Sequence, residues 1–337
     1  MPVTGAVPAA VRKLADADFG DIAQRFADAG FTVGQPGRGI LTIESGSSPG
    51  LALGPASARA SVLVSVGVHG DETGPIEVVA HVLDGLAQHP GALAVDLMIC
   101  VGNLDAIAAG KRFIDADLNR MFRPVRGSLA SAAEAARADA MIAATDAFFT
   151  GAGPLRWHLD LHTAIRPSVY PTFAIVPDLI ADTGKQALIG WLGQAAIGAI
   201  IMNPQSAGTY SYYSAEFHGA AGSTVELGRV GTLGQNDLSL FADVSQALAD
   251  LLRGAAPAAS KVEPHVFRVA QQIMKLSDGF TMAFDRNTQN FTALRQGEVI
   301  ATDGDTVYTV QHPEELVVFP NPEVRVGLRA GLMVVRA

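Results

Sequence analysis

Short apolar runs of strand length alternate with segments of helical spacing through the first 255 residues, and this alternation restricts the possible folds more than any other feature. The run SVLVSVGV is almost continuously apolar and rich in valine, which is typical of a strand covered on both faces, as in a parallel sheet. Strand runs lie at 61–68, 94–101, 155–162, 172–177 and 223–228, and helical segments at 76–88, 131–149, 184–198 and 235–254. The alternation predicts an α/β fold with a mixed sheet flanked by helices.

The two ends of the chain have a different character. Residues 14–30 are predicted to form one amphipathic helix, and the stretch GRGILTIES that follows reads as a strand. Small residues and a proline at 254–261 indicate a linker, beyond which short apolar runs are separated by glycine, aspartate, asparagine and proline. We therefore predict a large α/β domain at 1–255 and a small, β-rich domain at 256–337.

Composition narrows the functional classes. Hydrophobic residues make up 49% of the chain and charged residues 17%, which predicts a folded protein with a sizeable core. A net charge of -9 argues against nucleic-acid binding, because there is no basic excess to replace phosphate counterions. Cys100, the single cysteine, cannot form an internal disulfide and is expected to be a small buried hydrophobe. Without a signal-peptide pattern or an apolar run of membrane-spanning length, we expect a cytoplasmic protein that does not bind membranes.

A histidine and a glutamate follow the first buried strand run. His69 and Glu72 lie three residues apart in the sequence HGDE, so a tight turn can direct both side chains at one point. Ligands collect at the carboxyl ends of strands in open α/β sheets, and imidazole and carboxylate are both zinc ligands. Taken alone, the pair is better explained as a polar surface turn than as a metal site.

A second histidine, His162, lies at the end of the strand run LRWHLDLH. Together with His69 and Glu72 it completes a ligand set that leaves one coordination position open, which is typical of catalytic rather than structural zinc sites. Asp160 shares its face of the strand, as does His158. Asp160 is either a partner that orients a metal ligand or an ordinary surface carboxylate.

Glu226 is an acidic residue within the apolar strand run STVELG. Burying a carboxylate is costly without a partner, so its presence needs a reason. One explanation is a salt bridge at the end of the sheet. The functional explanation is a general base that removes a proton from water beside the metal.

Basic residues cluster in the segment 110–123, together with Asn103 before it. The segment contains Lys111, Arg112, Arg120 and Arg123 and lies between regular elements. It is either a solvated loop or a binding loop, because arginine binds carboxylates through two parallel hydrogen bonds. Near a metal site, such a loop indicates an anionic substrate.

In order along the chain, the motifs HGDET-P, Asn103 with Arg112, DLNR, DLHTAIR and VELG resemble the succinylglutamate desuccinylase/aspartoacylase family of zinc hydrolases. The closing stretch LVVFPNPEVRVGLRAGLMV resembles the C-terminal region of the desuccinylase branch. The motifs span residues 69 to 335, and their joint order is far more specific than any one of them. Leu104, where family members often have proline, and Pro167 after DLHTAIR depart from the pattern.

The resemblance implies a zinc-carboxypeptidase-like catalytic domain with one Zn²⁺ per subunit. It also implies a role for each matching residue: His69, Glu72 and His162 as metal ligands, Glu226 as the catalytic glutamate, Arg112 as the group that polarises the scissile carbonyl, and Asn119 and Arg120 as binders of a substrate carboxylate. Among Tyr210, Tyr212 and Tyr213, at least two are expected to serve only in packing.

The reaction that this resemblance implies is hydrolysis of N2-succinyl-L-glutamate to succinate and L-glutamate, the last step of arginine degradation through succinylated intermediates. Three alternatives remain open: a related acylase acting on N-acetylaspartate or another N-acyl amino acid, a zinc carboxypeptidase, and an inactive metal-binding scaffold. In the first two the partner is again a small substrate. The sequence does not predict an oligomeric state.

Overall fold

The computed structural model describes residues 6–45, 59–285 and 287–337. Its strands are β1 Thr32–Gly37, β2 Ile40–Glu44, β3 Ser61–Val66, β4 Asp96–Val101, β5 Arg156–Ala164, β6 Phe173–Pro177, β7 Ala199–Asn203, β8 Ala221–Arg229, β9 His265–Met274, β10 Thr281–Met282, β11 Thr292–Arg295, β12 Val299–Asp303, β13 Thr306–Thr309, β14 Glu314–Val318 and β15 Arg329–Arg336. The main sheet is 12-stranded, in the order β1-β2-β4-β3-β5-β8-β6-β7-β9-β15-β14-β11.

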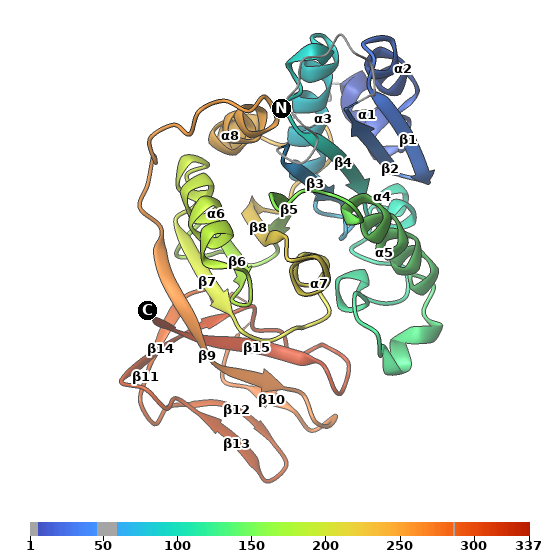
Figure 1. Ribbon diagram of the computed structural model, residues 1–337. Helices are drawn as coiled ribbons and strands as arrows, with labels where there is room; N and C mark the ends of the chain where they lie inside the picture. The colour runs from blue at the N-terminus through green and yellow to red at the C-terminus, as the bar shows by residue number, and fades with distance from the viewer. Residues whose placement is uncertain (1–5, 46–58, 286) are drawn as a thin grey trace.

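Helices cover the sheet (Figure 1). They are α1 Ala9–Ala15, α2 Gly20–Asp28, α3 Gly74–Ala87, α4 Leu104–Ala109, α5 Ala135–Phe149, α6 Asp182–Gln194, α7 Tyr210–His218 and α8 Ala242–Leu252, with short 3₁₀ turns at Pro90–Ala92, Leu118–Arg120, Gly127–Ser131 and Leu238–Phe241. Within the described residues, none of these helices combines the length and hydrophobicity needed to cross a bilayer.

The two faces of the sheet contribute to different cores because strand side chains alternate in direction. On β3, Val62 and Val64 belong to the same hydrophobic cluster as residues of α1, α3, α6 and α8. Leu63, between them, belongs to the opposite cluster, which includes residues of α5 and α7. The strand is therefore buried on both faces, and the prediction of a mixed sheet flanked by helices is confirmed.

Four neighbouring strands, β4, β3, β5 and β8, run parallel to one another. Their carboxyl ends consequently lie at one edge of the sheet, where ligands collect in folds of this kind. β6 is antiparallel to β8, and β1 and β2 form an antiparallel extension beyond β4. The strand order thus brings together the sequence-distant segments that follow β3 and end β5.

The prediction of a single helix at 14–30 is wrong. The chain forms α1 and α2 instead, and the break between them contains Ala17, whose φ of 60° lies in the left-handed region. Apolar spacing continues across the break, and one core contains Leu14 of α1, Phe19 between the helices and Phe26 of α2. Periodicity alone therefore did not reveal the break.

The C-terminal region is small and rich in β structure, as predicted, but it is continuous with the main sheet. α8 ends at Leu252 and β9 begins at His265, where β9 pairs in parallel with β7. β10, β12 and β13 form a separate 3-stranded sheet. Phe173 of β6 and Phe291 near β11 share one hydrophobic cluster, with their ring centroids 5.2 Å apart.

Candidate metal centre

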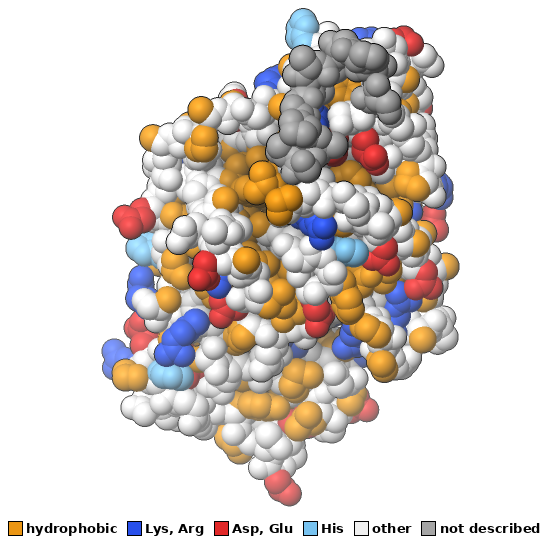
Figure 2. Space-filling view, viewed as in Figure 1, with side chains coloured by type: hydrophobic (Ala, Val, Ile, Leu, Met, Phe, Trp, Pro, Cys, Tyr) orange, Lys and Arg blue, Asp and Glu red, His pale blue; other side chains and the backbone are white. Residues whose placement is uncertain are grey.

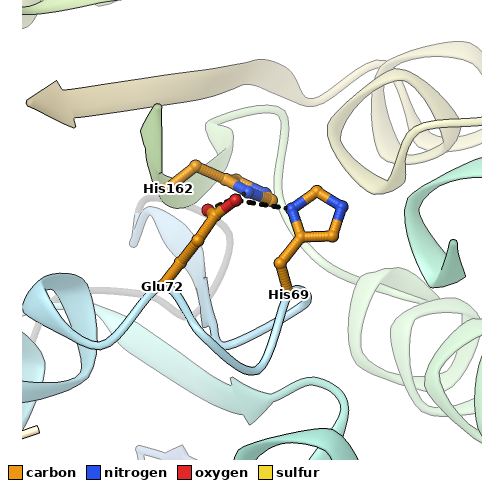
Figure 3. Close-up of side chains that lie close together, drawn as sticks. All are labelled: His69, Glu72 and His162. Atoms are coloured by element: carbon orange, nitrogen blue, oxygen red, sulfur yellow. Dashed lines mark hydrogen bonds and ion pairs between the residues drawn. The ribbon is translucent and has the colours of Figure 1, made fainter. Parts of the chain in front are cut away.

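The turn between β3 and α3 brings His69 and Glu72 to the side of His162. The Glu72 N–H donates to the His69 carbonyl oxygen at 3.2 Å, which closes the turn, and His162 lies near the end of the neighbouring strand β5. One ligand atom from each of the three residues lies within 4.8 Å of the others, and all three residues are buried. Figure 3 shows both imidazole rings directed at the Glu72 carboxylate.

The Glu72 carboxylate is the hub of this cluster. Its Oε1 lies 2.8 Å from His69 Nδ1, and its Oε2 lies 2.9 Å from His162 Nδ1. The Thr163 N–H donates to Oε2 at 2.9 Å, and Arg112 Nη1 donates to Oε1 at 2.6 Å. Two imidazole nitrogens and a carboxylate therefore converge from two elements on one buried point.

Charges of opposite sign offset the effect of burial on the pKa values of these groups. Burial raises the pKa of Glu72, but the two histidines outweigh it and hold this pKa well below its usual value. Burial lowers the pKa of His162, but Asp160 and Glu72 outweigh it and raise this pKa well above its usual value. The site thus stabilises a positive charge next to Glu72.

Each histidine has a carboxylate at its other ring nitrogen. Asp117 Oδ1 lies 2.9 Å from His69 Nε2, and Asp160 Oδ2 lies 3.0 Å from His162 Nε2. The second contact is an ion pair whose angle does not satisfy a hydrogen bond. Such carboxylate–histidine pairs fix the orientation of metal-binding imidazoles. The structure places Asp160 where the sequence suggested, whereas the contribution of Asp117 was not predicted.

A buried polar chain continues behind Asp160. Ser65 Oγ donates to Asp160 Oδ1 at 2.6 Å and lies 2.8 Å from His158 Nε2. His158 Nδ1 lies 2.7 Å from Ser214 Oγ of α7. His158 and Asp160 are both 0% exposed, so this chain connects β3, β5 and α7 beneath the ligand cluster and holds Asp160 in place.

Glu226 lies beside the ligand cluster, and among the residues that the structure describes it forms no ion pair. It is aligned with His162 across the parallel pair of β5 and β8, so the two side chains project from the same face. Its Oε2 atom is buried and has no hydrogen-bond partner within the described residues. Burial, followed by repulsion from Glu72, raises the pKa of Glu226 to about 7. Among the described residues no salt bridge explains this carboxylate.

The predicted carboxylate binders lie just outside the ligand cluster. Asn119 is buried, and its Oδ1 accepts the Tyr210 N–H at 2.9 Å, at the start of α7. Arg120 Nη1 donates to the Asn119 carbonyl oxygen at 2.7 Å, and Arg120 Nη2 lies 3.8 Å from Asp117 Oδ2. Lys111, in contrast, is exposed. Part of the basic segment 110–123, including Asn119 and Arg120, therefore faces the ligand cluster and forms a wall beside it, while Lys111 faces solvent.

Glu134, just before α5, anchors the segment that carries Arg112 and was not singled out from the sequence. Its carboxylate accepts the N–H groups of Ile114, Asp115 and Ala116 at 2.7, 3.1 and 3.0 Å. Asn103 also donates to it, at 3.4 Å. In the sequence Glu134 is one of three acidic residues in an alanine-rich segment, so nothing there set it apart.

The three tyrosines of α7 are engaged in structural contacts. Tyr210 OH lies 2.6 Å from Thr145 Oγ1, and Tyr212 OH donates to the Pro204 carbonyl oxygen at 3.1 Å. Tyr213 OH donates to Asp146 at 2.7 Å. Packing is thus the role that the structure gives them, and the helix that contains them was not predicted. Cys100 is fully buried, as predicted.

Comparison with known proteins agrees with this geometry. The model of the succinylglutamate desuccinylase/aspartoacylase catalytic domain matches residues 58–252, and that of the AstE/AspA barrel-sandwich hybrid domain matches residues 262–337. The succinylglutamate desuccinylase of Burkholderia orbicola is 44% identical over 301 residues, which cover 89% of this chain and 86% of that protein.

Two solved structures are also similar. The succinylglutamate desuccinylase of Vibrio cholerae superposes with a TM-score of 0.82 at 32% identity and covers 92% of this chain and 88% of its own. The succinylglutamate desuccinylase of Vibrio parahaemolyticus superposes with a TM-score of 0.81 at 32% identity, and the match covers 91% of this chain and 88% of that one. On these matches, the chain belongs to the succinylglutamate desuccinylase/aspartoacylase family of hydrolases.

Proposed function

We propose that this protein hydrolyses the amide bond of N2-succinyl-L-glutamate, releasing succinate and L-glutamate, and that it does so with a bound Zn²⁺. The observation that carries the proposal is the convergence of His69, Glu72 and His162 on one buried point, with the unpaired Glu226 carboxylate beside it. The 44% identity to a named succinylglutamate desuccinylase supports the choice of substrate.

The donor set fits a catalytic zinc ion. Two imidazoles and one glutamate are the ligands of catalytic sites that keep a position open for water or substrate, and the carboxylates at the outer nitrogens are typical of such sites. A zinc ion held there supplies Lewis-acid polarisation of the amide carbonyl and lowers the pKa of water. We propose His69, Glu72 and His162 as its ligands.

Glu226 is proposed to handle the proton. Its carboxylate removes a proton from the water that attacks the amide carbon, and then donates that proton to the nitrogen of the departing glutamate. The position beside His162 and the absence of a salt bridge among the described residues leave this carboxylate free for the task.

Arg112, Arg120 and Asn119 are proposed to bind and polarise the substrate. The Arg112 guanidinium already lies against Glu72, so it is close enough to donate to the oxygen that becomes negative during attack. Arg120 and the Asn119 amide nitrogen are proposed to bind a substrate carboxylate, because the amide oxygen of Asn119 is already taken by α7.

We also propose a metabolic pathway, a cellular location and a domain division for this protein. In this view the reaction is the last step of arginine degradation through succinylated intermediates, in the cytoplasm, with a small anionic N-acyl amino acid as its substrate. Residues 1–255 form the catalytic domain and residues 256–337 a second, β-rich domain. Binding to nucleic acid or membranes is not expected.

A substrate panel tests the proposal. Purified zinc-loaded protein would be assayed with N2-succinyl-L-glutamate, N-acetyl-L-aspartate and a dipeptide with a free C-terminus. We expect the succinylated substrate to be hydrolysed fastest, and Glu226→Gln to reduce this rate by about 10²- to 10⁴-fold. Faster turnover of acetylaspartate or of the dipeptide would establish a different acylase or a carboxypeptidase. Metal-loaded protein without activity on any substrate would indicate an inactive scaffold.

A further inference from the structure

Arg329, the first residue of β15, carries a positive charge that the protein does not neutralise. Its Nη1 atom is buried and lacks a hydrogen-bond partner within the described residues. Among the residues that the structure describes, no carboxylate forms an ion pair with the Arg329 guanidinium. Arg329 is half-buried, and a guanidinium whose inner N–H groups are buried without a partner is costly, so its retention calls for an anion from outside the chain.

The surroundings of Arg329 are themselves cationic and lead to the ligand cluster. Burial, followed by repulsion from Arg120, lowers the pKa of Arg329 to about 9. Arg120 Nη2 in turn lies 3.8 Å from Asp117, and Asp117 contacts His69 at 2.9 Å. Residues 325–328, which directly precede Arg329, line one cleft with residues 123–129, so the start of β15 lies against the segment that follows Arg120.

A second guanidinium, that of Arg123, has a buried Nε without a partner among the described residues. The backbone of Gly208 packs tightly against this region: a Cβ there would lie 2.6 Å from the Arg120 carbonyl oxygen and 3.2 Å from Arg123 Cδ. Arg120 and Arg123 are thus held on one compact wall.

Arg123 also lines a cleft of about 290 Å³ between residues 123–129 and 325–328. Figure 2 shows Lys and Arg side chains over the loop that precedes α5, at the right of the view. The other two arginines of the cleft are paired, Arg126 with Asp139 at 2.7 Å and Arg325 with Asp115 at 3.2 Å. The charges of Arg126 and Arg325 are therefore neutralised by carboxylates, whereas Arg329, just beyond the cleft, has no such partner among the described residues.

We propose that Arg329 binds one carboxylate of the substrate, next to Arg120, so that the C-terminal region takes part directly in substrate recognition. The inference rests on the proposed function, because N2-succinyl-L-glutamate carries three carboxylates and Asn119 with Arg120 accounts for one. A guanidinium held at the start of a strand that is paired on both sides provides a charged hydrogen bond of fixed direction.

The test compares Arg329→Gln with the wild type on the full substrate and on three analogues. N2-butanoyl-L-glutamate, N2-succinyl-L-glutamine and N-succinyl-4-aminobutanoate each lack a different carboxylate. We expect the variant to lose about 10- to 100-fold in kcat/KM on N2-succinyl-L-glutamate, mainly through KM. On the one analogue that lacks the carboxylate bound by Arg329, the variant and the wild type should be equal.

Two further variants keep the result interpretable. Arg268→Gln changes an exposed arginine on the neighbouring strand β9 and should match the wild type on every substrate. Arg329→Lys keeps the charge and should show a smaller loss of kcat/KM, with the same dependence on the analogue. This variant provides the test if Arg329→Gln does not fold.

Unchanged kinetics in the Arg329 variants, or equal losses on all four substrates, would overturn the role of Arg329 while leaving the proposed reaction intact. A wild type that fails to hydrolyse N2-succinyl-L-glutamate would instead overturn the proposed function, and this inference with it.

Discussion

The two histidines that we propose as metal ligands each contact a carboxylate, and these two carboxylates differ in how readily the sequence reveals them. Asp160 and His162 lie two residues apart on a strand, so their shared face follows from strand geometry. Asp117 and His69 are 48 positions apart and meet only because the loop before the 3₁₀ turn at 118–120 folds back over the cluster. The first pair could be proposed from the sequence, whereas the second required the tertiary structure.

Asn119→Asp should separate substrate binding from folding. The aspartate keeps an oxygen acceptor for the Tyr210 N–H, but it removes the amide donor and introduces a negative charge. We expect KM for the succinylated substrate to rise about tenfold or more, which corresponds to about 1.4 kcal/mol, with little change in melting temperature. Steady-state kinetics and calorimetry measure both effects. An unchanged KM would remove Asn119 from the binding site.

Glu134→Gln should destabilise the protein in a pH-dependent way. Burial raises the pKa of Glu134, but the N–H donors of residues 114–116 outweigh it, so this pKa lies below its usual value of 4.5. A lowered carboxylate pKa stabilises the fold above the unfolded value, and this contribution is lost as the pH falls through the folded value. We expect a loss of about 1–3 kcal/mol at pH 7.

Urea unfolding of the wild type and of Glu134→Gln at a series of pH values measures this difference. It should be full at neutral pH and shrink progressively below about pH 4.5. A stability difference that stays constant down to pH 3 would show that the charge of Glu134 is not what anchors the loop.

Among the elements, the turn between β3 and α3 depends on a glycine. A Cβ on Gly70 would lie 2.3 Å from the backbone of Ala106 and Ile107 in α4, and 2.6 Å from the Lys111 carbonyl oxygen. Only a glycine lets the turn approach α4 this closely. The positions of His69 and Glu72 therefore depend on contact between the turn and a short helix that the sequence analysis did not predict.

Gly70→Ala should push this turn away from α4 and weaken metal binding. We expect at least about tenfold weaker zinc affinity, measured by competition with a chelator, and a loss of stability of about 1–3 kcal/mol from overpacking. Gly85→Ala is the matched control. Gly85 lies in α3, and a Cβ there would have no atom within 4 Å apart from the backbone of its own helix. The substitution should therefore be neutral or slightly stabilising. Equal zinc affinity for the wild type and Gly70→Ala would contradict this role of the turn.

The elements that were predicted well are those with strong periodicity. The buried runs that became β3, β4 and β5 and the helical spacing of α3 and α5 were identified within a few residues. α7 was missed because its tyrosines and serines give no clear helical stripe: all residues from 210 to 215 are buried. The break between α1 and α2 was missed because both helices bury apolar residues in one core.

At the scale of the whole molecule, the C-terminal region extends the main sheet instead of forming an independent layer. β9 pairs with β7, and one hydrophobic cluster combines Ile201 of β7 with Leu332 of β15. The linker composition at 254–261 correctly indicated a change in character, but long-range strand pairing is not encoded in local composition. The participation of this region in the sheet was therefore not predictable from the sequence.

A chain ending at residue 255 should not form a stable soluble protein. Its β7 edge would be unpaired and Phe173, Ala199 and Ile201 would lose their apolar cover. We expect the truncated chain to aggregate, and the full-length chain to unfold in one cooperative calorimetric transition. A soluble fragment with native-like circular dichroism, or two separate transitions in the full chain, would show that the two regions are energetically independent.

The proposed activity depends most on the three residues that are proposed to hold a single zinc ion beside Glu226. The most direct test is the zinc content of purified wild type, His162→Gln and Glu226→Gln by elemental mass spectrometry, with hydrolysis of N2-succinyl-L-glutamate measured on the same samples. We predict that the wild type and Glu226→Gln each retain one zinc ion per chain and that His162→Gln loses it, while only the wild type is active. Full zinc retention by a folded His162→Gln variant, or wild-type turnover by Glu226→Gln, would contradict the account.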